Sequence, residues 1–169
     1  MELTEARQQF IQSWGVMGSQ WGINRTMSQV HALLLISEEA LCADDIMAEL
    51  NISRGNANMN IRALLDWGLV YKHIKAGERK EYFVAEKDLW TAARKVIKER
   101  KKRELEPVLD MLETLNNSEF TGDAEEVRQF SKRVADVRTF ARQSDKLLSG
   151  IVKSDRKWFL GGFAKLFGK

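Results

Sequence analysis

Apolar side chains recur three and four positions apart through most of the chain, a spacing that predicts amphipathic helices. The stretches that carry it are residues 3–20, 24–37, 87–117 and 124–151. Pro107 lies inside the third stretch and should kink it or mark the meeting of two helices. The fourth keeps a coiled-coil spacing for more than three heptads, so it needs a helical partner to cover it.

A shorter helical pattern and a more polar one lie in the middle of the chain. Residues 43–50 open with Asp44 and Asp45, which suit the positive end of a helix dipole. Ser53 can cap the next helix, which runs to about Trp67, and Gly68 is suited to ending it.

The period then changes to that of strands. Residues 69–74 and 80–85 are β-rich and flank the tip 75–79, so they predict a two-stranded hairpin. A support helix, a turn, a polar helix and a hairpin in this order predict a mainly α, winged helix-turn-helix fold with a small two-stranded β wing. The long terminal helices then remain available for a dimer interface.

The polar helix has one apolar side and one side suited to nucleic acid. Ala57, Ile61, Leu64 and Leu65 form the expected buried stripe. The opposite side carries Gly55, Asn56, Met59, Arg62 and Asp66, flanked by Arg54 and Asn58. Asn and Arg side chains can bond base edges and phosphates, and a glycine lets the backbone approach DNA closely. Lys75, Arg79 and Lys80 at the wing could reach a minor groove or flanking phosphates. The alternative is an ordinary solvated face, but asparagines are poor helix formers, which favours a functional role.

Residues 52–90 resemble the GbsR branch of the MarR family of bacterial transcriptional regulators. The fragments that carry the resemblance are residues 52–56 (ISRGN), 66–70 (DWGLV) and the wing 77–80 (GERK) ahead of Tyr82 and Phe83.

The resemblance implies a homodimer that places one recognition helix per subunit in successive major grooves of double-stranded DNA, with the wings at the minor grooves. The family's DNA-contacting positions fall on Ser53, Arg54, Gly55, Asn56, Asn58 and Met59, and its wing arginine on Arg79. Met59 stands where a basic residue is frequent, which suggests contact with a base methyl group or readout of DNA shape.

Some relatives in this branch sense choline or similar osmolytes, and a quaternary ammonium group needs an aromatic cage. Trp14, Trp21 and Trp90 are the rings that could supply one. The alternative, which we favour, is that these rings pack in the core or the dimer interface.

The composition limits the number of domains, the cellular location and the disulfides that we expect, but it does not indicate a function. With 169 residues and 44% apolar side chains, a single domain is expected, with the DNA-binding core at 21–86 and dimerisation helices at 1–20 and 87–169. The net charge is only +3, although residues 94–103 hold seven cations against one anion. We expect a cytoplasmic protein, because no signal peptide or membrane span is visible. The single cysteine, Cys42, excludes an intrachain disulfide, and we expect it to be an inert residue at the start of a helix.

Two further interpretations stay open. The leading hypothesis is a DNA-binding regulator that acts as a repressor under the control of a small ligand. The acidic residues Asp66, Glu78 and Glu81 near the proposed DNA face motivate the alternative, a protein-interaction adaptor without specific DNA binding. The aromatic and basic tail, residues 156–169, could settle on a membrane surface or contact the partner subunit, and we favour the subunit contact. No nucleophile with a paired base, metal-ligand cluster or cofactor motif is visible, so an enzyme is not expected.

Overall fold

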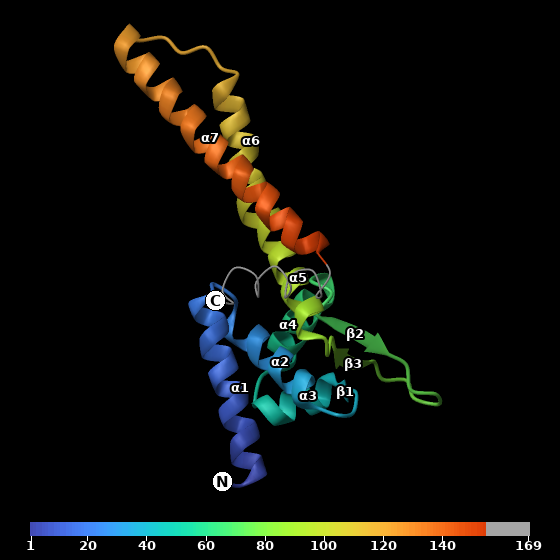
Figure 1. Ribbon diagram of the computed structural model, residues 1–169. Coiled ribbons are helices and arrows are strands. Elements are labelled where there is room, and N and C mark those ends of the chain that lie inside the picture. The colour runs from blue at the N-terminus through green and yellow to red at the C-terminus, as the bar shows by residue number, and fades with distance from the viewer. Residues whose placement is uncertain (155–169) are drawn as a thin grey trace, which may run out of the picture. The chain divides into compact units, whose positions relative to one another are not determined.

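The computed structural model describes residues 1–154, and its helices and strands follow the predicted order (Figure 1). They are α1 (Leu3–Gln20), α2 (Arg25–Ile36), β1 (Leu41–Cys42), α3 (Ala43–Leu50), α4 (Arg54–Asp66), β2 (Val70–His73), β3 (Tyr82–Ala85), α5 (Leu89–Arg100), the π-helical turn η1 (Lys101–Leu105), α6 (Glu106–Asn116) and α7 (Ala124–Lys153). These residues form two compact units, which divide after Ala92. The predicted tail contact of residues 156–169 lies outside the described residues. Within residues 1–154, no helix is both long enough and apolar enough to cross a membrane.

The first unit is a winged helix-turn-helix, as predicted. Its core is built by α2, α3 and α4, and the apolar stripe of α4 faces it as expected, except that Leu65 is only half-buried. The buried side chains at its centre are Val30, Leu33, Leu34, Ile46, Ala57, Ile61, Leu64 and Val70.

The sheet has three strands rather than the predicted two. β3 lies in the middle and pairs antiparallel with β2 on one side and with β1 on the other. In β1, Leu41 lies opposite Phe83 and Cys42 opposite Tyr82. A strand of two residues is too short to show an alternating pattern, which is why the sequence does not reveal it. By pairing with β1, the wing is fixed to the residues that lead directly into α3.

α1 and α2 pack closely because glycines remove side chains from their contact. A Cβ at Gly18 would lie 2.0 Å from Ser28 Oγ, and one at Gly15 would lie 2.7 Å from Cγ of Gln29. Glycine is a poor helix former, yet α1 continues to Gln20. The gain from close packing offsets the low helix propensity of glycine.

The second unit contains a helical hairpin of α6 and α7. The predicted helix of residues 87–117 is divided into α5 and α6, with η1 between them. Pro107 stands in the first turn of α6, where its missing N–H does least harm, so it marks the meeting of two helices. Leu112 packs against Val134 and Ala141 of α7 at the centre of the hairpin. The predicted seam of α7 is therefore covered in part within the chain, whereas Val137 stays 51% exposed.

Candidate nucleic-acid interface

The start of α4 presents most of the predicted DNA contacts on an exposed face. Ser53 caps the helix, because its hydroxyl oxygen accepts a hydrogen bond from the backbone N–H of Asn56 at 3.3 Å. The predicted residues that are exposed are Ser53, Arg54, Gly55, Asn58, Met59 and Arg62, and Asn56 is half-buried. Met59 is 60% exposed, so its side chain is accessible to a partner.

The asparagines of α4 have different tasks. Asn60 is buried, and its side-chain amide donates to the backbone oxygen of Asn56 at 2.8 Å and to Oδ1 of Asn56 at 2.7 Å. These bonds satisfy the buried amide and hold the Asn56 side chain with its NH₂ group available as a donor. Asn58 is exposed, and neither hydrogen bond nor ion pair engages it within residues 1–154, so its whole amide is available to a base edge.

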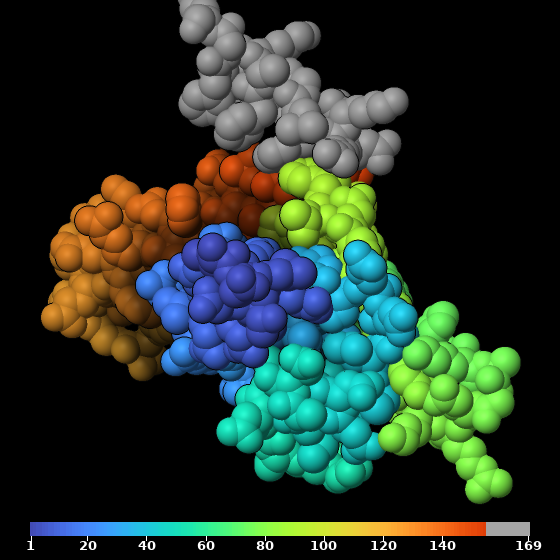
Figure 2. Space-filling view, turned by 90° about the horizontal axis from the view of Figure 1, so that it is seen from below, coloured from blue at the N-terminus to red at the C-terminus, as the bar shows by residue number. Residues whose placement is uncertain are grey.

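The wing projects from the first unit, and in Figure 2 its green residues stand out from the helices beside it. Two of its four lysine and arginine side chains are engaged by the wing itself. Lys72 pairs with Glu81, and the ammonium group of Lys75 lies 4.2 Å from the centre of the Tyr82 ring, in a cation–π contact. In the described part of the chain, Arg79 has neither an ion pair nor a hydrogen bond, and it is exposed near the tip. Of the predicted wing contacts, Arg79 is therefore the one most available to DNA.

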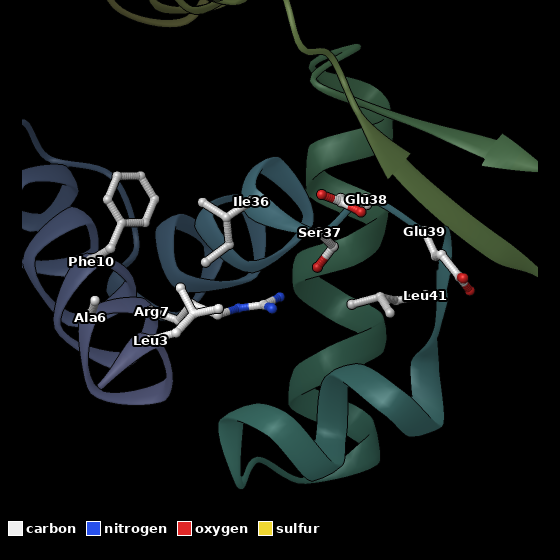
Figure 3. A pocket seen from close by; sticks show the side chains of 9 residues that line it. All are labelled: Leu3, Ala6, Arg7, Phe10, Ile36, Ser37, Glu38, Glu39 and Leu41. Carbon is white, nitrogen blue, oxygen red and sulfur yellow. The ribbon is translucent and has the colours of Figure 1, made fainter. Parts of the chain in front are cut away.

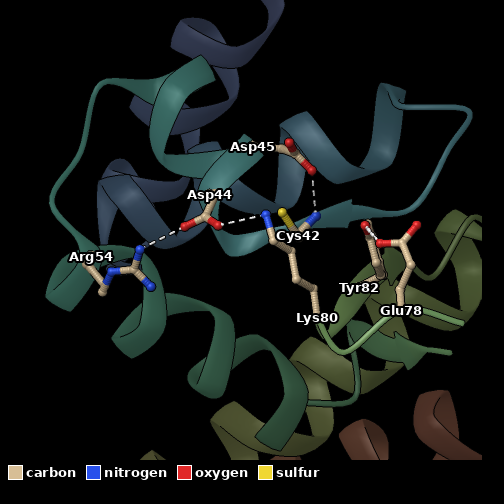
Figure 4. A network of polar contacts seen from close by, with 7 residues as sticks. All are labelled: Cys42, Asp44, Asp45, Arg54, Glu78, Lys80 and Tyr82. Atoms are coloured by element: carbon tan, nitrogen blue, oxygen red, sulfur yellow. Dashed lines mark hydrogen bonds and ion pairs between the residues drawn. The ribbon is translucent and has the colours of Figure 1, made fainter. Parts of the chain in front are cut away.

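Three elements meet at Asp44 in the first turn of α3 (Figure 4). Its Oδ1 accepts from Arg54 at 2.8 Å, and its Oδ2 accepts from Lys80 at 3.1 Å. The hydrogen bond and charge of Lys80, together with the charge of Arg54, hold the pKa of the Asp44 carboxyl below its usual range. The same contact raises the pKa of Lys80. The sequence pattern assigned Asp44 to the helix dipole and missed this junction, because the partners lie 10 and 36 positions away.

The start of α3 is fixed by Cys42 and Asp45. Cys42 occupies the expected position before the helix and is 4% exposed. Its backbone N–H donates to the Asp45 carboxylate at 2.8 Å, which lowers the pKa of that carboxyl. Asp45 therefore serves the helix start, and Asp44 is left to face the two cations.

The rings proposed for an aromatic cage lie in different surroundings. Trp14 stacks on Phe10 with ring centres 5.4 Å apart and lies tilted on the His31 ring at 6.2 Å. Trp21 is 59% exposed where α1 ends, and Trp90 is half-buried in the first turn of α5. The contacts of Trp14 match the packing role that we favoured from the sequence.

A separate groove of about 560 Å³ lies between the first half of α1 and the end of α2 (Figure 3). Its lining combines apolar residues with Arg7, Glu38 and Glu39 and includes none of the three tryptophans. Figure 3 shows the Arg7 side chain extending from α1 into this groove. The first unit therefore has a groove at a position that the aromatic pattern did not indicate.

His31 is a core residue, and its burial has an electrostatic cost. The side chain is 7% exposed in α2, and among the described residues its Nε2 has no hydrogen-bond partner. Burial, followed by the charge of Lys87, lowers the pKa of His31 to about 4. The imidazole is therefore neutral in the folded protein at neutral pH.

Comparisons with known proteins agree with this geometry. The family described as bacterial regulatory protein, arsR family, matches residues 28–72, which run from α2 to β2 and include both helices of the helix-turn-helix. A solved structure, titled crystal structure of a transcriptional regulator, is similar over 87% of this chain and 95% of its own, with 20% sequence identity and a TM-score of 0.65. No curated protein matches. Both matches are to regulators rather than enzymes and agree with a winged-helix fold, whereas the MarR family and its GbsR branch stay a prediction.

Proposed function

We propose that this protein is a dimeric, sequence-specific regulator of transcription that binds double-stranded DNA through α4 and the wing. The observation that carries the proposal is the exposed face at the start of α4. It places Gly55, Asn58 and Met59 together, and at Gly55 no side chain stands between the backbone and an approaching groove. A helix of this kind, behind a support helix and ahead of a wing, is the arrangement that enters a major groove.

The contacts divide by chemistry. Asn58 has a free amide for a base edge, and the exposed thioether of Met59 suits the methyl group of thymine. Arg62 and Arg79 are exposed, with no ion pair or hydrogen bond among the described residues, and they are suited to phosphates. Asn56 offers chiefly its NH₂ donors, because one lone pair of its side-chain oxygen is taken by Asn60.

The homodimer is part of the proposal, and the helical hairpin supports it. Exposed apolar side chains continue along α7 beyond the seam that α6 covers, and α6 adds two of its own. They are Val108, Met111, Phe130, Val137, Phe140 and Leu147. A second copy with the same surface would bury them symmetrically, since a two-fold interface uses one patch twice.

Control by a small ligand is proposed as well, as repression would require a signal that releases DNA. The choline-like cation remains the ligand suggested by the resemblance, with Trp14, Trp21 and Trp90 as its proposed cage. The groove beside Arg7 provides a competing position whose mixed charges suit a different chemistry. Saturating choline should lower duplex affinity if the cage exists, and Trp21→Ala should remove that effect.

The central test is selection of duplexes from a random-sequence pool, followed by fluorescence anisotropy on the selected duplex and a scrambled one across a salt series. We expect enrichment of a two-fold symmetric site, binding that weakens steeply with salt, and a preference of ~10³-fold or more for the selected duplex. Arg79→Ala should weaken binding to both duplexes, while Arg7→Ala, which removes the same charge from α1, should not.

Two outcomes would overturn the proposal. Equal binding of selected and scrambled duplexes would leave only non-specific attraction to charge. Absence of duplex binding at low salt would favour the adaptor interpretation, in which the winged helix binds a protein.

A further inference from the structure

We propose that Asp44 sets the selectivity of the DNA-binding surface by holding Arg54 and Lys80 in place and by reducing their attraction to arbitrary phosphates. This inference rests on the proposed function and assigns a role to a residue outside the predicted contacts. Asp44 would act as a positioning and specificity-determining residue rather than as a contact to a base.

The geometry supports the positioning role. Arg54 is the first residue of α4, Lys80 precedes β3, and Asp44 belongs to α3, so one carboxylate joins the recognition helix, the support helix and the base of the wing. Each carboxylate oxygen takes one cation, at 2.8 Å from Arg54 and 3.1 Å from Lys80. Figure 4 shows the two cations reaching the carboxylate from opposite sides. The base of the wing and the recognition helix are therefore linked through Asp44, two residues beyond the pairing of Cys42 with Tyr82.

Arg54 and Lys80 stay exposed to solvent although Asp44 holds them in place. The side chain of Arg54 is 67% exposed and that of Lys80 is 59% exposed, and both line a cavity of about 200 Å³ together with Asp44 and Asn58. A guanidinium has five N–H donors and an ammonium has three, so each retains donors for a phosphate while bonded to Asp44. Because Asp44 holds the side chains of Arg54 and Lys80 in position before DNA binds, a correctly placed phosphate meets cations that are already oriented.

The charge of Asp44 has the opposite effect on wrongly placed DNA. Non-specific binding depends on how many phosphates the protein neutralises, and its salt slope grows with that number. With one carboxylate between them, the two cations Arg54 and Lys80 present a net charge of only +1 to DNA at this position. The neighbouring carboxylates have other partners, because Asp45 bonds the Cys42 N–H and Glu81 pairs with Lys72. Asp44 is therefore the acid that moderates Arg54 and Lys80.

The test compares Asp44→Asn with the wild type on selected and scrambled duplexes over a range of salt. The variant should bind scrambled DNA roughly threefold more tightly, and its non-specific salt slope should steepen by up to about one unit, as two cations are released from one anion. Binding to the selected duplex should not gain in proportion, so the ratio of specific to non-specific affinity should fall at least threefold.

Asp66→Asn is the matched control. It removes the same charge from an exposed position at the end of α4, where no cation pairs with the carboxylate among the described residues. We expect a smaller change in the affinity ratio than for Asp44→Asn. In a background that lacks both partners, Arg54→Ala with Lys80→Ala, the Asp44→Asn change should lose its effect on the ratio.

The inference and the proposed function fail in different ways. Unchanged selectivity in Asp44→Asn, or an equal loss in Asp66→Asn, overturns the role of Asp44 while the wild type still selects its site. A wild-type protein that selects no duplex overturns both. Circular dichroism and thermal unfolding of Asp44→Asn should match the wild type, and a cooperative loss of structure would assign Asp44 a folding role instead.

Discussion

At the scale of single residues, a substitution at Gly55 should change the stability of α4 and its affinity for DNA in opposite directions. A Cβ at this position meets nothing within 4 Å in the free protein. Gly55→Ala should raise the free energy of unfolding by up to ~1 kcal/mol, since alanine is the better helix former. The added methyl group should nevertheless obstruct the groove and weaken binding to the selected duplex by roughly fivefold or more, equivalent to ~1 kcal/mol. Denaturant unfolding and anisotropy measure the two effects.

Gly150→Ala is the control for this prediction. Gly150 lies in α7, and a Cβ there also meets nothing within 4 Å. The variant should gain helix stability in the same way and keep its duplex affinity. An unchanged affinity in Gly55→Ala would show that the backbone of α4 does not approach DNA closely.

His31 should make folding stability dependent on pH. The unfolded chain binds a proton near pKa 6.5, whereas burial lowers the pKa of the folded imidazole to about 4. Between these values unfolding takes up a proton, so stability is fully present above pH 6.5 and is lost as the pH falls. The loss from this residue should reach roughly 2 kcal/mol by pH 5, at about 1.4 kcal/mol per unit.

The measurement is denaturant unfolding from pH 7.5 to pH 5 for the wild type and His31→Leu. The difference in stability between them should shrink or reverse as the pH falls, because the variant lacks the titrating group. His73→Leu, at an exposed position, should follow the wild type. Parallel pH curves for the wild type and His31→Leu would show that His31 is protonated, or otherwise partnered, in the folded protein.

At the scale of elements, Lys87 stabilises the end of α2 from a distant part of the chain. Its ammonium group donates to the backbone oxygens of Leu34 at 2.9 Å, of Leu35 at 2.7 Å and of Ser37 at 2.7 Å. These oxygens lie where a helix leaves its carbonyls without partners, and a cation there also complements the helix dipole.

Lys87→Met should therefore lower the free energy of unfolding by ~1–2 kcal/mol. Arg62→Met serves as the control, because it removes an exposed cation that has no ion pair among the described residues, and it should change stability by no more than ~0.5 kcal/mol. Denaturant unfolding at pH 7.5 compares the two. Equal small effects would mean that water satisfies the carbonyls of α2 as well as Lys87 does.

The elements were largely predictable because they depend on local signals. Ser53 and Gly68 mark the two ends of α4 through a cap and a positive φ of 67°, and both signals are visible in the sequence. What could not be predicted depends on pairing between distant residues. β1 exists only because β3 lies beside it, and Asp44 acquires its partners only when α3, α4 and the wing are assembled. The residue types of the candidate site were thus predictable, whereas their availability to DNA was not.

At the scale of the whole molecule, the open question is what covers the apolar side of the helical hairpin. Phe140 and Leu147 are each 71% exposed on α7. Side chains of this size favour burial by ~1.5–3 kcal/mol each when fully removed from water. A second copy that places the same surface against this one would gain that energy.

Sedimentation equilibrium should therefore give twice the 19.4 kDa mass of one chain for the wild type. The double variant Phe140→Glu with Leu147→Glu should sediment as a monomer with unchanged helix content, because the new charges would be buried without partners in the dimer. Thr139→Glu is the control, because it adds a charge to the residue beside Phe140 in α7, which points about 100° away around the helix, and it should leave the dimer intact.

The monomeric variant should also lose affinity for a two-fold symmetric duplex far more than for a single half-site. A dimer that survives both glutamates would place the interface elsewhere, and α1 would be the next element to substitute.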